Sequence, residues 1–283
     1  MSACTPKNEK HKNHHKVCVF VASSDNTKDV FRNVIASYEI YWGKCRYPKF
    51  VGLNSYDEEI ARRFTIMTAP PDGWRAELLE QIRLLPCEIT HILLMLDDFL
   101  LLSPVNDERL DYLIDKALQI GFIYTRLVPM SSALLFRLIR RLKNRLSGKV
   151  FDEIPRRKEY FSSLQPALWN RDHLVAMLEL PGTIWEFETQ GLPHAKHYAI
   201  THTPPIRCVH IVEKGRWMPD TLLRFKYQGL PFMPGGRPLR PSIEIPLLWW
   251  HRFKFAIIGY TGVRARRMLG LAMPKHKQNQ RSK

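Results

Sequence analysis

Two adjacent acids, Asp97 and Asp98, interrupt an apolar run, ILLMLDDFLLLSPV, that spans residues 92–105. An apolar run of this kind predicts a buried strand of a parallel sheet, with the acids at its carboxyl end. Open α/β sheets bind their ligands at that end. Adjacent carboxylates are costly to bury unless a cation meets them, so we expect Mg²⁺ or Mn²⁺ carrying a diphosphate here. In the simpler interpretation Asp97 caps a turn and Asp98 is solvated.

Strand and helix patterns alternate on both sides of this run. The pattern predicts strands over residues 17–22, 47–54 and 121–128, and helices ending near Trp42, covering 74–84 and beginning at Asn106 or Asp107. Such alternation is typical of a mostly parallel sheet joined by right-handed crossovers. The sequence therefore predicts an α/β fold, with a single domain in which helices flank a central sheet.

Polar residues follow the first predicted strand, in the order Ser23, Ser24, Asp25 and Asn26. They fall at the carboxyl end of that strand, directly before a helix. In the simpler interpretation Ser24 or Asp25 is merely the N-cap of the helix, which is the commoner role. Asp25 can also accept hydrogen bonds from a nucleobase or ribose.

The net charge of +16 is concentrated in three segments. Residues 1–16 carry +3, residues 131–151 carry +6 and residues 245–283 carry +9, which leaves about −2 for the rest. Residues 131–149 have the spacing of an amphipathic basic helix, which fits either an ordinary surface helix or a membrane or acceptor contact. Trp, Phe and Tyr mix with the cations of 245–283, which favours an interfacial membrane anchor. Because nothing resembles a groove-reading motif, we do not expect nucleic acid as the partner.

These segments suggest three parts: a disordered basic leader over 1–16, a globular domain over 17–227, and a Pro/Gly linker with a basic aromatic tail over 228–283. The leader lacks the apolar stretch of a signal peptide, and no window is apolar enough to span a bilayer. The five cysteines are scattered, as in reduced cytosolic proteins. We therefore expect a cytoplasmic protein held peripherally at the anionic inner face of the cytoplasmic membrane.

Further candidate residues lie in the second half of the chain. In IWEFE, Glu186 and Glu188 would point different ways on a helix, so one can enter a site while the other caps the helix or forms a salt bridge. Trp185 beside them is either a sugar-stacking platform or a buried anchor. His194, His197 and His202 lack the spacing and the further ligands of a zinc cluster. His210 lies in an apolar strand pattern, where a lone histidine is usually a core residue.

Taken together, the motifs resemble bacterial glycosyltransferases of the GT-A fold that build surface polysaccharides such as lipopolysaccharide and capsule. The resemblance covers residues 17–218, and its pieces follow the family's order. They are VFVASSDN, YWGKCRYPKFVGLN, ILLMLDDFLLLSPV, FIYTRLVP, YFSSLQPALWNRDHL, IWEFE and HIVEKGRW. A GT-A-like domain with a basic amphipathic C-terminal extension is the fold that this resemblance implies.

The resemblance also implies roles for residues. Asp97 and Asp98 stand where the family keeps a DxD motif, although no residue separates them here. Asp98 and His210 would hold Mn²⁺ or Mg²⁺, and Asp97 would contact ribose or sugar hydroxyls. Asp25, with Ser23, would contact the base and ribose. The catalytic base would be Glu188 or Glu186.

The implied activity is transfer of a sugar from a nucleotide-sugar donor to a hydroxyl of a glycan or lipid-linked acceptor, with inversion by single displacement. One alternative is a catalytically inactive GT-A-like protein that binds a glycan or nucleotide. A nucleotidyltransferase is a second alternative. The absence of a Gly-rich phosphate loop near the first strand argues against it.

Overall fold

The computed structural model describes residues 14–130, 148–156, 160–189 and 191–241. Its centre is an eight-stranded sheet with the order β3-β2-β1-β4-β8-β6-β9-β7. Strands β1 to β4, β6 and β9 run in one direction, and β8 and β7 run in the other. The expected mostly parallel sheet is confirmed. The strands are β1 (Val17–Ala22), β2 (Lys49–Leu53), β3 (Thr65–Thr68), β4 (His91–Leu96), β6 (Tyr124–Arg126), β7 (Phe151–Glu153), β8 (Ala167–Asn170) and β9 (Tyr198–Ile200).

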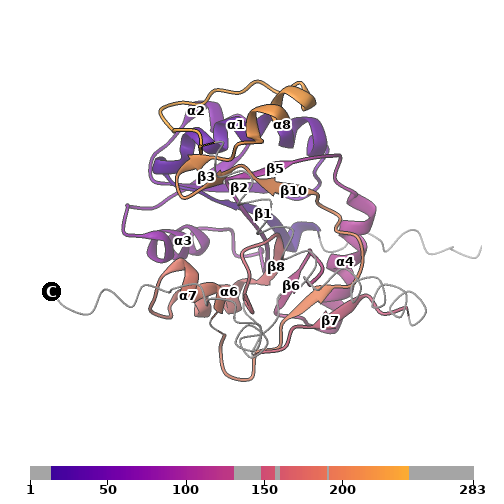
Figure 1. Ribbon diagram of the computed structural model, residues 1–283. Helices are drawn as coiled ribbons and strands as arrows, with labels where there is room; N and C mark the ends of the chain where they lie inside the picture. The colour runs from indigo at the N-terminus through magenta and orange to yellow at the C-terminus, as the bar shows by residue number, and fades with distance from the viewer. Residues whose placement is uncertain (1–13, 131–147, 157–159, 190, 242–283) are drawn as a thin grey trace, which may run out of the picture.

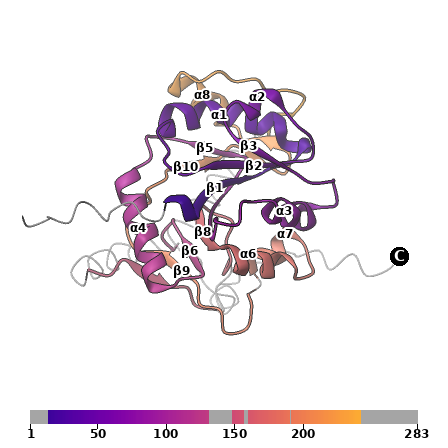
Figure 2. The same ribbon diagram turned by 180° about the vertical axis from the view of Figure 1, so that it is seen from behind.

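Helices cover both faces of this sheet (Figures 1 and 2). They are α1 (Lys28–Trp42), α2 (Glu58–Ala61), α3 (Trp74–Arg83), α4 (Asp107–Ile120), α6 (Arg171–Leu178), α7 (Ile184–Thr189) and α8 (Thr221–Gln228). Alternate residues of β1 point to opposite faces, so Val19 joins the core under α1, α2, α4 and α8, whereas Phe20 joins the core under α3, α6 and α7. Both cores are therefore anchored on the same central strands.

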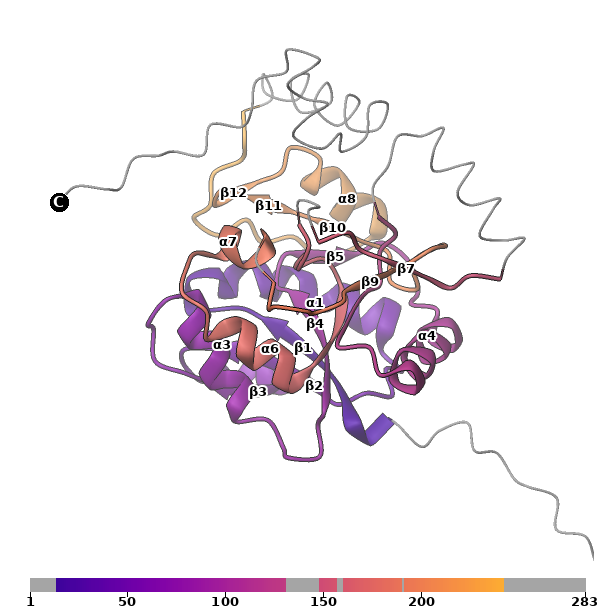
Figure 3. The same ribbon diagram turned by 90° about the horizontal axis from the view of Figure 1, so that it is seen from below.

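Two smaller sheets lie beside the central one. β5 (Phe99–Leu101) pairs antiparallel with β10 (Cys208–His210), and β11 (Val212–Glu213) forms a hairpin with β12 (Arg216–Trp217). Figure 3 shows both of these sheets near α8. Because β5 follows β4 after only Asp97 and Asp98, the β5–β10 ladder brings the late chain next to the two acids.

The structure corrects the expectation of a linker from residue 228 onward. Gln228 belongs to α8, and the segment 229–241 packs on the domain. The ring of Phe232 lies 5.0 Å from those of Trp217 and Phe225. Asn33 donates a 2.7 Å hydrogen bond to the carbonyl of Met233 and accepts one of 2.7 Å from its amide. Proline and glycine here shape a packed segment, because its apolar and backbone groups find partners on α1 and α8.

Several expectations fall on the edge of the described chain or beyond it. The basic helix over 131–149 lies outside the described residues up to residue 147, and the tail is outside them from residue 242. Of the expected leader, only His14–Lys16 is described, as a short 3-10 helix. The cysteines that the structure describes are all free thiols. No helix in the described part of the chain is long and apolar enough to span a bilayer.

Two buried histidines contact each other, His173 of α6 and His197, which directly precedes β9. The Nε2 atoms of His173 and His197 are 2.9 Å apart, and His197 Nδ1 lies 3.1 Å from the carbonyl oxygen of Phe161. His197 must donate from Nδ1 to that carbonyl, so its Nε2 accepts from His173 and both rings are neutral. Burial lowers the pKa of each histidine to about 4. Among the residues described, no group of three or more His, Cys, Asp or Glu side chains is placed to hold a metal ion.

The His173–His197 pair makes the free energy of unfolding depend on pH. In the unfolded chain the histidines bind protons below about pH 6.5, whereas in the folded chain the pair stays neutral down to about pH 4. The free energy of unfolding is therefore highest above about pH 6.5 and falls as the pH drops from about 6.5 to about 4. We expect each histidine to cost about 1–2 kcal/mol of unfolding free energy at about pH 5, measured by urea unfolding. His173→Gln keeps a donor for His197 without titrating and should flatten this dependence. The exposed His15→Gln is the control, and an equal slope in both variants would refute the assignment.

Candidate functional site

Asp97 and Asp98 occupy the tight turn that joins β4 to β5, at the carboxyl end of β4. Asp97 is partly buried and accepts a 2.8 Å hydrogen bond from Ser23 Oγ, at the end of the neighbouring parallel strand β1. Burial raises the pKa of Asp97 to about 7, and the nearby Asp98 carboxylate adds to the rise, although hydrogen bonds from Thr27 and Ser23 oppose it. A nearby positive charge would stabilise the ionised form of such a partly buried carboxyl group.

The Asp98 carboxylate meets His210, which reaches it from β10. His210 Nδ1 lies 3.0 and 3.1 Å from the two carboxylate oxygens, and His210 Nε2 lies 3.0 Å from Gln165 Nε2. Nδ1 therefore donates to Asp98, and Nε2 accepts from the Gln165 amide. The pairing of His210 with Phe99 across the β5–β10 ladder fixes this contact. His210 is exposed, unlike a core histidine.

The two acids of α7 differ in their surroundings. Glu188 is partly buried, and its Oε1 accepts a 2.8 Å hydrogen bond from the backbone amide of Leu164. Burial raises the pKa of Glu188, while the Leu164 amide and the charges of His210 and Arg126 oppose the rise. Glu188 and His210 thus contact adjacent residues of one loop, because the amide of Leu164 meets Glu188 and the side chain of Gln165 meets His210.

Glu186 instead lies at the start of the helix. Its Oε2 accepts hydrogen bonds of 2.7 and 3.0 Å from the amide and hydroxyl of Thr183, and its side chain is exposed. One acid caps the helix while the other turns inward, which is one of the arrangements that the sequence left open. Of the two base candidates, Glu188 is the one that the fold places near His210.

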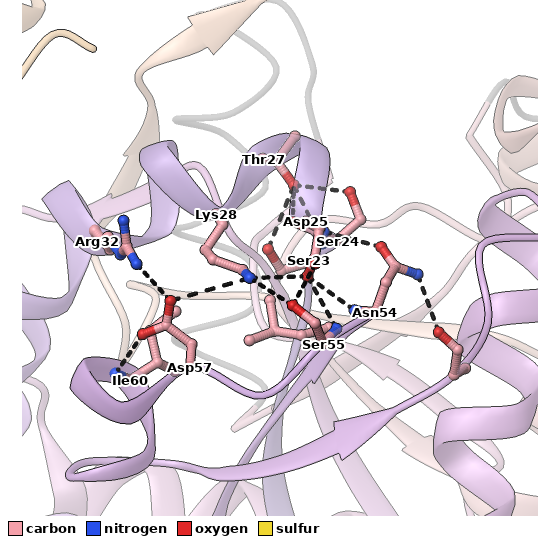
Figure 4. Close-up of polar contacts among 12 residues, drawn as sticks. Ser23, Ser24, Asp25, Thr27, Lys28, Arg32, Asn54, Ser55, Asp57 and Ile60 are labelled. Carbon is pink, nitrogen blue, oxygen red and sulfur yellow. Dashed lines mark hydrogen bonds and ion pairs between the residues drawn. The ribbon is translucent and has the colours of Figure 1, made fainter.

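Asp25 joins the loop after β1 to the loop after β2 (Figure 4). Its Oδ1 accepts from the amides of Asn54 and Ser55 at 3.0 and 3.1 Å, and its Oδ2 accepts from the Ser55 hydroxyl at 2.5 Å. Lys28 Nζ lies 3.1 Å from Oδ1. Burial raises the pKa of Asp25, but these hydrogen bonds outweigh it and the net shift is downward. Asp25 is exposed and its Oδ2 can accept a further hydrogen bond, so the contact expected with a base or ribose stays a prediction.

Three residues near the site had no role in the sequence interpretation. Gln165 lies in YFSSLQPALWNRDHL, a piece of the resemblance to which no residue role was attached. Arg237 lies in the expected linker, but its guanidinium pairs with Asp29 of α1 at 2.6 Å and its charge acts on Asp97. Arg126 ends β6, which runs parallel to β4, and its charge acts on Glu188. The rule that functional residues follow parallel strands would have found Arg126.

The donor atoms of the site suit a divalent cation shared with a ligand. No group of three or more His, Cys, Asp or Glu side chains gathers within the described ranges, so the protein offers a pair, Asp98 and His210. One carboxylate with one imidazole suits Mn²⁺ better than Mg²⁺, which takes oxygen ligands, and both ions commonly complete their shell with phosphate oxygens and water. An ion held by both residues would take the place of the Nδ1 proton that joins them, and on that condition the pair fits the ion that the resemblance implies.

We expect Asp25→Ala to lower the unfolding free energy of the ligand-free protein by about 1–3 kcal/mol, because the amides of Asn54 and Ser55 lose their acceptor. Urea unfolding at neutral pH measures the change. Asp72→Ala, which removes an exposed acid from the loop before α3, is the matched control. Equal stability of the two variants would show that the Asp25 contacts do not stabilise the fold.

No protein-family model and no curated protein sequence matches the chain. Among solved structures it is similar to 4-diphosphocytidyl-2C-methyl-D-erythritol synthase from Anaerococcus prevotii, with 9% identity and a TM-score of 0.41 over 75% of this chain and 96% of that chain. A cytidylyltransferase from Leptospira borgpetersenii gives 10% identity and a TM-score of 0.37 over 95% of this chain and 99% of that one. CMP:2-keto-3-deoxy-manno-octonic acid synthetase in complex with CTP gives 8% and 0.35, over 84% and 99%. At these values the likeness carries no information about what the chain transfers.

Proposed function

We propose that this protein transfers a sugar from a nucleotide-sugar donor to a hydroxyl group of a glycan or lipid-linked acceptor. The observation that carries the proposal is the contact of His210 Nδ1 with the Asp98 carboxylate at 3.0 Å, at the carboxyl end of a parallel strand. Glu188 is bound to Leu164, next to the Gln165 that meets His210. An acid pair, an imidazole and a partly buried carboxylate are groups that a metal-dependent sugar transfer can use. The resemblance in sequence points to an acceptor from surface polysaccharide synthesis.

On the donor side, Asp98 and His210 would hold Mn²⁺ or Mg²⁺. Such an ion, when bound, supplies positive charge that stabilises a diphosphate leaving group. Asp97 would accept hydrogen bonds from ribose or sugar hydroxyls, and Ser23 orients it through their 2.8 Å bond. Arg237 adds positive charge on the same side, because its field already acts on Asp97.

On the acceptor side, Glu188 would take the proton from the attacking hydroxyl. Burial raises its pKa, which makes it a stronger base than an exposed carboxylate. Trp185 lies three residues earlier on the same helix and is 61% exposed, so it is not a buried anchor and can stack on a sugar ring. Attack by the acceptor oxygen on the anomeric carbon in one displacement would invert its configuration.

The loop after β1 favours a diphosphate donor over a triphosphate substrate. Residues 23–28 contain no glycine, and they form a short 3-10 helix followed directly by α1. Enzymes that grip a triphosphate commonly do so with the backbone amides of a Gly-rich loop. Nucleotidyl transfer and ligand binding without turnover remain the competing activities that the following measurements separate.

Thermal unfolding with a panel of nucleotides identifies the donor. A nucleoside diphosphate or nucleotide sugar at 100 times its Kd should stabilise the fold by about 2.7 kcal/mol, and only with Mn²⁺ or Mg²⁺ present. Asp98→Ala should abolish this metal-dependent shift, whereas Asp72→Ala should retain it. Stabilisation by a nucleoside triphosphate alone would favour nucleotidyl transfer, and no stabilisation by any nucleotide would refute the donor site.

Two glutamates on one helix allow a matched test of the base. Glu188→Gln should lower kcat for sugar transfer by about 100-fold or more while nucleotide binding persists, because the amide cannot accept the proton. Glu186→Gln, which changes an exposed capping residue, should stay within a few-fold of wild type. Transfer that survives in the Glu188 variant would show that another group is the base.

A further inference from the structure

The outer face of α8 carries apolar side chains that the described part of the chain leaves uncovered. Phe225 and Thr221 point into the core, whereas Leu222, Leu223 and Tyr227 are exposed, with Tyr227 reaching 94%. Leu223 and Tyr227 are four residues apart and so lie one above the other on the helix. Lys226 lies in the same stripe and is exposed.

The segment that follows extends this surface. Met233 and Leu239 are 58% and 47% exposed, so five of the eleven large exposed hydrophobic side chains of the described chain fall within residues 222–239. The others are scattered over the remaining described residues. We call the exposed side chains of residues 222–239 the α8 surface.

The charge around the α8 surface is positive. Residues 211–241 hold six Lys or Arg and two acids, a net +4, and both acids are already paired, Asp220 with Arg224 and Glu213 with Arg240. Lys214, Arg216 and Lys226 form no ion pair with any residue that the structure describes. Exposed leucines and a tyrosine among unpaired cations fit an anionic layer with an apolar interior.

Charge argues against the other occupants. A second copy of the chain would bring the +4 of its own residues 211–241 against this positively charged region in a two-fold interface. Residues 242–283 of the same chain carry nine Lys or Arg and one acid, so they would add like charge to it. A nucleic acid would satisfy the cations but would leave the leucines exposed to water or phosphate.

We propose that the α8 surface docks on a membrane rich in anionic lipids, with Leu222, Leu223 and Tyr227 at the level of the headgroups and the cations on lipid phosphates. Tyrosine suits this position because its ring is apolar and its hydroxyl stays hydrated. The chain continues from Pro241 into a sequence with paired tryptophans and nine cations, which suits the same partner. The inference does not depend on the proposed sugar transfer.

Co-sedimentation of the full chain with lipid vesicles tests it. Wild type should bind vesicles of phosphatidylcholine with about one third phosphatidylglycerol and bind pure phosphatidylcholine about tenfold or more weakly. The double variant Leu223→Ser/Tyr227→Ser should lose about tenfold in affinity for the anionic vesicles. Lys214→Gln/Lys226→Gln should weaken binding to those vesicles and reduce its dependence on salt.

The control removes the same kind of side chain elsewhere. Ile120 and Tyr112 are 56% and 45% exposed on α4, which lies away from α8 in Figures 1 and 3. Ile120→Ser/Tyr112→Ser should bind vesicles as wild type does. Binding by the Leu223/Tyr227 variant at wild-type strength overturns the proposal, as does a change from dimer to monomer in that variant or the absence of vesicle binding in wild type. Nucleotide-dependent thermal shifts should be the same in all variants, which separates this outcome from failure of the donor site.

Discussion

The cost of enclosing two adjacent carboxylates at the end of a buried strand is the constraint on which the rest of the structure depends. Asp97 and Asp98 cannot move apart, because β4 and β5 hold the residues on either side of them. Each acid is therefore met by a partner from a different part of the chain, Asp97 by Ser23 and Asp98 by His210. Neighbouring strands position both partners. Ser23 directly follows β1, which is parallel to β4, and His210 lies on β10, which pairs antiparallel with β5.

An antiparallel strand in the middle of the sheet supplies the other half of the site. β8 lies between β4 and β6 and opposes both of them, so the chain before it arrives at the edge where β4 and β6 end. Leu164 and Gln165 belong to that arriving chain, and they contact Glu188 and His210 respectively. The reversal in direction of one strand thus brings a loop to the edge where the parallel strands end.

Sequence patterns predicted those elements whose burial shows in their own stretch of sequence. β1, β4 and α4 have continuous apolar or periodic patterns, and Asn106 caps α4 as expected. Contacts that join distant segments leave no local pattern, which is why the His173–His197 pair and the Gln165–His210 bond were not foreseen. The segment 229–241 was misjudged because Pro and Gly signal turns and linkers equally well. Asp25 was expected at a ligand from its position alone, and only its partners in space reveal that it ties two loops together.

The long separation between Asp98 and His210 has a consequence for how the protein matures. The two residues are 112 positions apart, so a growing chain presents Asp98 well before β10 exists to meet it. Loop closure over such a distance comes late in folding, after local helices and strands have formed. During synthesis on the ribosome, Asp98 therefore lacks its histidine partner until most of the domain has emerged. The proposed site is then completed only near the end of translation, so we expect truncated chains that lack β10 to have an incomplete site.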